Sequence, residues 1–147
     1  MKKVLIPFIL LLILSTTVKA QAVEPLTNDQ FKEKIWNYDK DKEWKYLGNK
    51  PAIIDLYATW CGPCKRLAPI LAEIQKDYGN KLQIYKVDTD KEKQLAQLFN
   101  VSSIPLMVFI PLKGKPFLVT GLRPKEDLVK IINETLLSNS ETTASSL

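Results

Sequence analysis

The chain has 147 residues, 46% hydrophobic and 25% charged, which suits one globular domain with a real core. Its formal net charge is +5, but three of its 21 basic residues lie in the first 20 positions, where there is no acidic residue, so 18 remain against 16 acidic residues. That balance gives no reason to expect a nucleic acid or an acidic substrate as a partner.

The N-terminal segment has the pattern of a secretory signal. Lys2 and Lys3 precede an apolar run from Val4 to Leu14, and Val18-Lys19-Ala20 resembles a small-residue cleavage site. We expect residues 1–20 to be a signal peptide, cleaved after Ala20, that exports the protein to the periplasm. The alternative is a membrane anchor, but a spanning helix needs about 20 apolar residues, and this run is shorter. No stable membrane anchor is therefore expected after processing.

The next segments predict a helix and a loop. Residues 21–26 are a short lead-in with at most a marginal first strand. Thr27 and Gln30 have the spacing of a capping box and open a helical pattern. The apolar face of this helix holds Phe31, Ile35 and Trp36. Residues 37–49 are rich in Asp and Lys and predict a loop. The loop side chains expected to fold onto the core are Trp44, Tyr46 and Leu47.

Two buried strands and a long helix are predicted next. Residues 52–58 are an apolar run with one carboxylate, Asp55, which is typical of a strand covered on both faces. A helix opens directly after it, within a Cys-x-x-Cys segment, and ends at Gly79-Asn80. Residues 82–88 predict the second strand. The apolar stripe of the helix holds Leu67, Ile70, Leu71 and Ile74.

The C-terminal third alternates in the same way. Asp90 is predicted to cap a helix, and Leu106 to Ile110 is predicted as a third strand. Lys113-Gly114-Lys115 predicts a turn, and Phe117 to Thr120 pairs back as a hairpin. Pro124 stands where the last helix starts. The stripe of the Asp90 helix holds Leu95, Leu98 and Phe99, and that of the last helix holds Leu128, Ile131, Ile132, Thr135 and Leu136.

This order of elements predicts the fold class. Crossover helices make neighbouring strands parallel, while the late hairpin adds an antiparallel pair. The expected architecture is a three-layer α/β/α sandwich around a mixed central sheet. The domain is expected to span residues 21–137, with residues 138–147 as a disordered polar tail.

The only two cysteines of the chain, Cys61 and Cys64, admit several uses. A structural disulfide closing so short a loop would contribute only about 2 kcal/mol. A zinc site needs more ligands, and the chain has no His and no third Cys. Covalent haem needs His after the second Cys, where Lys65 stands, and an iron–sulfur cluster lacks enough ligands. Dithiol redox chemistry needs only the pair itself, so neither a metal nor a cofactor is expected.

The position of the pair favours that chemistry. Cys61 falls where a buried strand ends and a helix begins, and the helix N-terminus stabilises a thiolate there. Cys64 lies one turn further on, on the same face and more buried, where it can attack a mixed disulfide formed by Cys61. Pro63 fits the first helical turn, because its missing N–H is not needed there.

The segment Trp60-Cys61-Gly62-Pro63-Cys64-Lys65 resembles the active site of the thioredoxin family, and the similarity runs from about Thr27 to Leu137. The resemblance implies a thioredoxin fold and protein-disulfide exchange. It also implies roles for Asp55, six positions before Cys61, as the buried carboxylate that takes a proton from Cys64, and for Lys86 as a lysine near it. An exposed Asp55 on an edge strand and a Lys86 that merely reaches solvent are the alternatives.

The same resemblance implies a substrate-binding surface. Ile104-Pro105 is similar to an Ile-Pro segment whose proline is cis and faces the disulfide, and Gly121 matches a glycine on the rim. Trp60 and Ile104 are expected to form a flat apolar docking surface beside Gly62 and Pro63. The sequence departs from the family pattern in two places. Leu106 stands where Thr is usual, and the stretch before Pro51 is longer than in compact cytosolic members.

These observations predict a reductase of protein disulfides in the cell envelope, similar to the exported thioredoxin-like proteins of bacteria. Its expected partners are disulfide-containing client proteins and a membrane thiol donor, because the family's soluble electron donor is cytosolic. An oxidant or isomerase using the same residues remains an alternative, as does a non-catalytic binding module. The presence of both cysteines argues against the module.

Overall fold

The sheet is organised around β2 (Ala52–Tyr57), the strand that leads to the cysteine pair. In the computed structural model, which describes residues 21–138, β2 lies between a parallel neighbour, β3 (Gln83–Asp88), and an antiparallel one, β4 (Leu106–Ile110). β1 (Glu24–Pro25) pairs with β3, and β5 (Phe117–Thr120) pairs with β4, giving the order β1-β3-β2-β4-β5. The mixed sheet and the marginal first strand are both confirmed.

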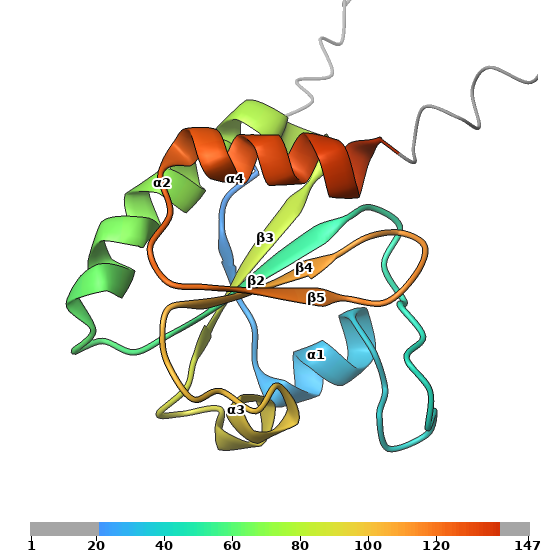
Figure 1. Cartoon of the computed structure of the whole chain (residues 1–147). Helices are drawn as coiled ribbons and strands as arrows, with labels where there is room; N and C mark the ends of the chain where they lie inside the picture. Colours follow the sequence, from blue (N-terminus) through green and yellow to red (C-terminus); the bar gives the residue numbers. More distant parts are fainter. Residues whose placement is uncertain (1–20, 139–147) are drawn as a thin grey trace, which may run out of the picture.

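Helices cover both faces of this sheet (Figure 1). One buried cluster joins one face to Phe31 of α1 and Leu95 of α3, and a second joins the other face to Leu71 of α2 and Leu128 of α4. The predicted three-layer sandwich is therefore confirmed. The helical elements are α1 (Asn28–Lys34), α2 (Gly62–Tyr78), η1 (Gly79–Lys81), α3 (Lys93–Leu98), α4 (Lys125–Ile131) and η2 (Ile132–Leu137).

Local capping signals were correct for α1 and wrong for α3. The Thr27 hydroxyl accepts the Gln30 N–H, and the Gln30 side chain accepts the Thr27 N–H, so the capping box is present. The N-cap of α3 is Glu92, without a side-chain capping bond, and not Asp90. Asp90 lies before the helix and its carboxylate accepts a hydrogen bond from Trp60 instead.

The loop between α1 and β2 packs through alternate side chains. Trp44 and Tyr46 lie partly buried against the core, and their rings stack with centroids 6.4 Å apart. Leu47, predicted to be buried with them, is 43% exposed. The Leu47 N–H donates to the Ile35 carbonyl at 2.9 Å. Side chains along an extended chain point to opposite sides in turn, so placing Tyr46 inward turns Leu47 outward.

The last helix changes its winding within the predicted stripe. Leu128, Ile132 and Leu136 are all buried, as expected, but the chain passes from α4 into a π-helical turn, η2, at Ile132. A repeat of four residues drifts around an α-helix of 3.6 residues per turn. The wider turn of a π-helix counters this drift and keeps all three side chains against the sheet.

Two predicted segments lie at the ends of the chain, beyond the residues that the structure describes. The predicted signal peptide and residues 139–147 of the predicted tail lie outside residues 21–138. Within that range, no helix combines the length and the apolar character needed to cross a membrane.

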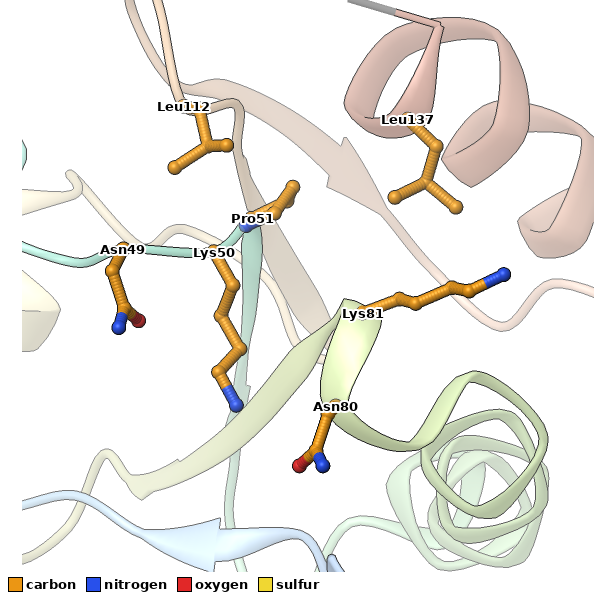
Figure 2. A pocket seen from close by; sticks show the side chains of 7 residues that line it. All are labelled: Asn49, Lys50, Pro51, Asn80, Lys81, Leu112 and Leu137. Atoms are coloured by element: carbon orange, nitrogen blue, oxygen red, sulfur yellow. The ribbon is translucent and has the colours of Figure 1, made fainter. Parts of the chain in front are cut away.

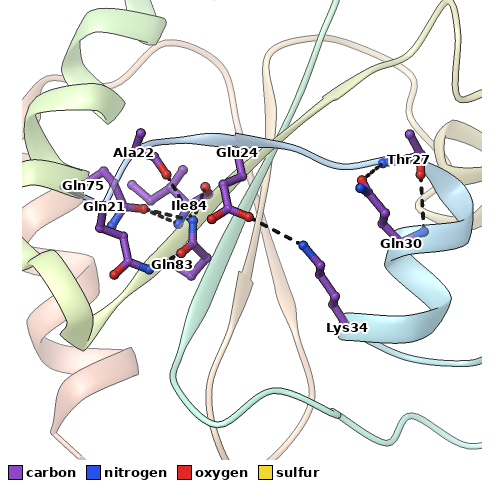
Figure 3. Close-up of polar contacts among 9 residues, drawn as sticks. All are labelled: Gln21, Ala22, Glu24, Thr27, Gln30, Lys34, Gln75, Gln83 and Ile84. Carbon is purple, nitrogen blue, oxygen red and sulfur yellow. Dashed lines mark hydrogen bonds and ion pairs between the residues drawn. The ribbon is translucent and has the colours of Figure 1, made fainter. Parts of the chain in front are cut away.

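Two buried glutamines tie the C-terminal end of α2 to the sheet (Figure 3). The Gln75 Oε1 accepts the Ile84 N–H at 2.6 Å, and its Nε2 donates to the Leu82 carbonyl at 2.9 Å. The Gln83 side chain donates to the Ala22 carbonyl at 3.3 Å. The backbone groups at the start of β3 therefore find their partners in side chains, which fixes the far end of the helix that carries both cysteines.

We predict that Gln75→Ala lowers the free energy of unfolding by about 2–3 kcal/mol, because it leaves a buried N–H and a buried carbonyl without partners. Urea unfolding followed by circular dichroism measures the change. Gln97→Ala, on the exposed side of α3, is the control and should change stability by about 0.5 kcal/mol or less. Equal effects of the two substitutions would contradict the assigned role of Gln75.

Candidate active site

The cysteine pair lies at the junction of β2 and α2. Cys61 is the N-cap of α2, and its N–H donates to the Ala58 carbonyl at 3.2 Å, which holds the turn that follows the strand. Cys61 and Cys64 form a disulfide, with Cα atoms 5.3 Å apart. The Cys64 N–H donates to Cys61 Sγ at 3.2 Å. Pro63 lies in the first turn, as predicted, where its missing N–H costs no hydrogen bond.

Both cysteines are buried in the disulfide form. Cys61 is 4% exposed and Cys64 is 3% exposed, so the expected difference in burial is negligible in this state. They pack with Ala58, Tyr57 and Ile104 in a small apolar cluster of their own. The disulfide is thus set into an apolar surface that surrounds the sulfur atoms.

The segment before β4 lies directly against the disulfide. The Ile104-Pro105 peptide bond is cis, as expected, and the Ile104 carbonyl oxygen lies 3.9 Å from Cys61 Sγ. The Pro105 carbonyl accepts the Gly121 N–H at 2.8 Å, and Gly121 has a φ of +87°, a conformation that glycine adopts readily. The structure therefore brings Cys61, Ile104, Pro105 and Gly121 together at one end of the sheet.

Trp60 extends from this surface and forms a hydrogen bond with Asp90, which the sequence analysis predicted to cap a helix. Its side chain is 70% exposed, and its indole N–H donates to the Asp90 carboxylate at 2.9 Å. Asp90 follows β3 as Trp60 follows β2. Because parallel strands end at the same edge of a sheet, residues that directly follow β2 and β3 lie close together. The order of elements could therefore have predicted the contact between Trp60 and Asp90.

Asp55 lies on β2, in the interior of the domain. It is 4% exposed, which excludes the exposed-edge alternative, and its Oδ1 has no hydrogen-bond partner among residues 21–138. Burial raises the pKa of Asp55 to about 7, and the nearby charge of Lys86 opposes this shift. Asp55 and Cys64 both line a cavity of about 140 Å³. This cavity gives the carboxyl group and the sulfur a shared space large enough for water.

Lys86 lies opposite Asp55 in the register of β2 and β3 and lines the same cavity, although the residue as a whole is exposed. Lys86 is therefore both close to Asp55 and accessible to solvent. The described part of the chain contains no cluster of three or more His, Cys, Asp or Glu side chains that could hold a metal ion.

Comparison with known proteins decides the family. The thioredoxin family model matches residues 22–134. The chain belongs to the thioredoxin family. A thioredoxin of Borreliella burgdorferi is 45% identical over 109 residues, which cover 74% of this chain and 93% of that protein. A thioredoxin of Staphylococcus saprophyticus is 42% identical over 85 residues, covering 57% of this chain and 81% of that protein.

Solved structures show the same fold. The structure of a Malassezia sympodialis thioredoxin is similar with a TM-score of 0.61 and 30% identity, covering 79% of this chain and 94% of that one. With its redox-active cysteine pair, this thioredoxin is a thiol–disulfide oxidoreductase that reduces disulfide-containing substrates.

The raised pKa of Asp55 predicts a specific dependence of stability on pH. Below about pH 3 the carboxyl group is mostly protonated in both folded and unfolded chains. Between its ordinary pKa of 3.8 and the folded value of about 7 it ionises only in the unfolded chain, so stability falls as pH rises. Asp55→Asn removes this loss, and the variant should exceed the parent protein by up to about 4 kcal/mol above pH 8.

Urea unfolding of the oxidised protein from pH 4 to 8.5 measures the difference. Glu43→Gln, which removes an exposed carboxylate from the α1–β2 loop, is the control and should show no such trend. A difference between Asp55→Asn and the parent that stays constant with pH would show that Asp55 titrates normally.

Proposed function

We propose that this thioredoxin reduces protein disulfides in the bacterial cell envelope, with Cys61 as the nucleophile and Cys64 as the resolving thiol. The hydrogen bond from the Cys64 N–H to Cys61 Sγ carries this assignment. In the reduced protein the same donor, together with the N-terminal end of α2, stabilises a negative charge on Cys61. Cys64 Sγ has no equivalent position, since it lies within the helix.

The first step is attack by the Cys61 thiolate on one sulfur of the client disulfide. A bond forms between Cys61 and that sulfur, while the second client sulfur leaves as a thiolate and takes a proton from solvent. The result is a mixed disulfide. The Ile104 carbonyl, beside Cys61 Sγ, and the cis Pro105 offer an extended client segment a backbone edge for pairing. Trp60, Gly62, Pro63 and Gly121 complete the proposed contact surface.

The second step is resolution by Cys64. Asp55 takes the proton of the Cys64 thiol across their shared cavity, directly or through water. A folded pKa of about 7 suits a base that must accept a proton near neutral pH. The Cys64 thiolate then attacks Cys61 Sγ, the remaining client sulfur leaves as a thiolate, and the Cys61–Cys64 disulfide forms. We assign Lys86 the role of adjusting the charge of Asp55.

The envelope location is supported by the sequence of residues 1–20, which has the pattern of a cleavable signal. Export removes the protein from a cytosolic electron donor. A membrane protein with a thiol pair is therefore the proposed source of the two electrons that restore the reduced form.

Trapping of client proteins tests the two cysteine roles. Cys64→Ser should accumulate mixed disulfides through Cys61, because no thiol is left to resolve them, whereas Cys61→Ser should trap almost none. Non-reducing gels of cells expressing each variant measure this difference. Equal trapping by the two variants would show that the nucleophile is wrongly assigned.

The reduction potential tests the direction of exchange. Thioredoxins have potentials of about −270 mV, against about −120 mV for a strongly oxidising periplasmic relative whose thiolate is more stabilised. Gly62 and Pro63 bring no cationic side chain to Cys61, so equilibration with glutathione buffers should give a value closer to −270 mV. Pro63→His should make the protein more oxidising, and Pro63→Ala, which adds no cation, should change it less. A potential near −120 mV would favour the oxidase alternative.

Export is tested by processing. When the full chain is expressed in a bacterium, the protein in the envelope fraction should begin at Gln21. N-terminal sequencing measures this directly, and an intact N-terminus on the envelope protein would favour an anchor over a cleaved signal.

A further inference from the structure

Lysines gather at the end of the molecule opposite the disulfide. The α1–β2 loop leads into β2, η1 leads into the parallel strand β3, and the β4–β5 turn follows the antiparallel strand β4. The topology therefore brings these three segments to one edge of the sheet, while Cys61 lies beyond the other edge. Residues 40–51 contribute four lysines and two carboxylates, η1 contributes Lys81, and the turn contributes Lys113 and Lys115. We call this surface the lysine end.

Two hollows confirm that these segments meet. Lys50, Lys81 and Leu112, one from each segment, line a hollow of about 390 Å³ (Figure 2). Lys42 and Lys115 line a second one of about 540 Å³. The ion pairs within residues 21–138 involve lysines elsewhere. The seven lysines of the lysine end outnumber the two carboxylates of its loop, Asp41 and Glu43, so the surface keeps a net positive charge.

Both ends of the described chain reach the same region. The Gln21 side chain donates to Gln83 (Figure 3). The Gln83 N–H donates to the Pro51 carbonyl at 3.0 Å, and Pro51 lines the first hollow. Leu137 lines that hollow as well. Gln21, the N-terminus proposed for the processed protein, therefore lies at the lysine end as well.

We propose that the lysine end is a docking surface for a membrane that carries anionic lipid headgroups. Lysine ammonium groups act as point charges and are attracted to a layer of headgroup phosphates without needing a shaped pocket. Leu112, which is 41% exposed among them, adds apolar contact at the surface. This inference goes beyond disulfide reduction and does not depend on the direction of exchange.

Docking in this orientation leaves the active site open. Cys61, Cys64 and the exposed Trp60 lie at the opposite end of the sheet, so they face away from the bilayer toward soluble clients or a membrane donor's extended domain. The surface therefore holds the protein near a membrane without covering its disulfide.

Vesicle sedimentation tests the proposal with the chain that begins at Gln21, which retains every described helix and strand. It should bind vesicles of equal parts phosphatidylglycerol and phosphatidylcholine at least about tenfold more strongly than vesicles of phosphatidylcholine alone, and salt should weaken the binding. The triple variant Lys42→Glu, Lys81→Glu, Lys113→Glu should lose this binding and keep its insulin-reducing activity.

A matched triple variant separates the surface from net charge. Lys91→Glu, Lys93→Glu, Arg123→Glu makes the same change in charge away from the lysine end and should retain most of the binding. Equal losses in the two triple variants, equal binding to neutral vesicles, or binding to single-stranded DNA at the same strength would each overturn the proposal. Loss of insulin reduction by vesicle-bound protein would overturn the orientation.

Discussion

The hydrogen bond between the Cys64 N–H and Cys61 Sγ is the contact on which the site depends. The first turn of a helix has N–H groups without partners inside the helix, and a side chain at the N-cap usually supplies an acceptor. Here a sulfur atom takes the place of the usual oxygen. The helix start therefore directs its partial positive charge at the atom that must carry a negative charge in exchange. β2 and the Ala58 turn hold that atom in place, and Gln75 holds the other end of the same helix.

Asp55 is a point at which the fold accepts an energetic cost, and the proposed mechanism gives that cost a use. A carboxyl group between two covered faces of β2 is desolvated, which explains its raised pKa. A hydrophobic residue of similar size would suit the strand better. In the proposed mechanism the carboxyl group receives the Cys64 proton across the cavity that the two residues share. Lys86, at the neighbouring position of β3, limits how far the pKa of Asp55 rises.

The sequence was sufficient for the architecture because its signals were local and strong. The apolar run of β2, the capping box at Thr27 and the Cys-x-x-Cys segment each specify a structure within a few residues, and all are found as predicted. The errors arose at residues whose positions depend on contacts with segments that are distant in the sequence. Asp is a common N-cap residue, but Asp90 instead accepts a hydrogen bond from Trp60, which follows the neighbouring strand β2. Leu47 is apolar, yet the inward placement of Tyr46 turns it to solvent. The π-helical turn after α4 follows from contact with the sheet rather than from propensity.

The short strand β1 imposes an order on assembly. Glu24 pairs with Tyr85 and Pro25 with Lys86, across about half of the domain's sequence. When the chain is made or transported from its N-terminus, these first residues have no strand to join until β3 has followed them. The same holds for β2, whose two hydrogen-bonded neighbours, β3 and β4, both follow it in the chain. The segment nearest the proposed cleavage position therefore gains its hydrogen bond from Gln83 only after about half of the domain's sequence has followed it.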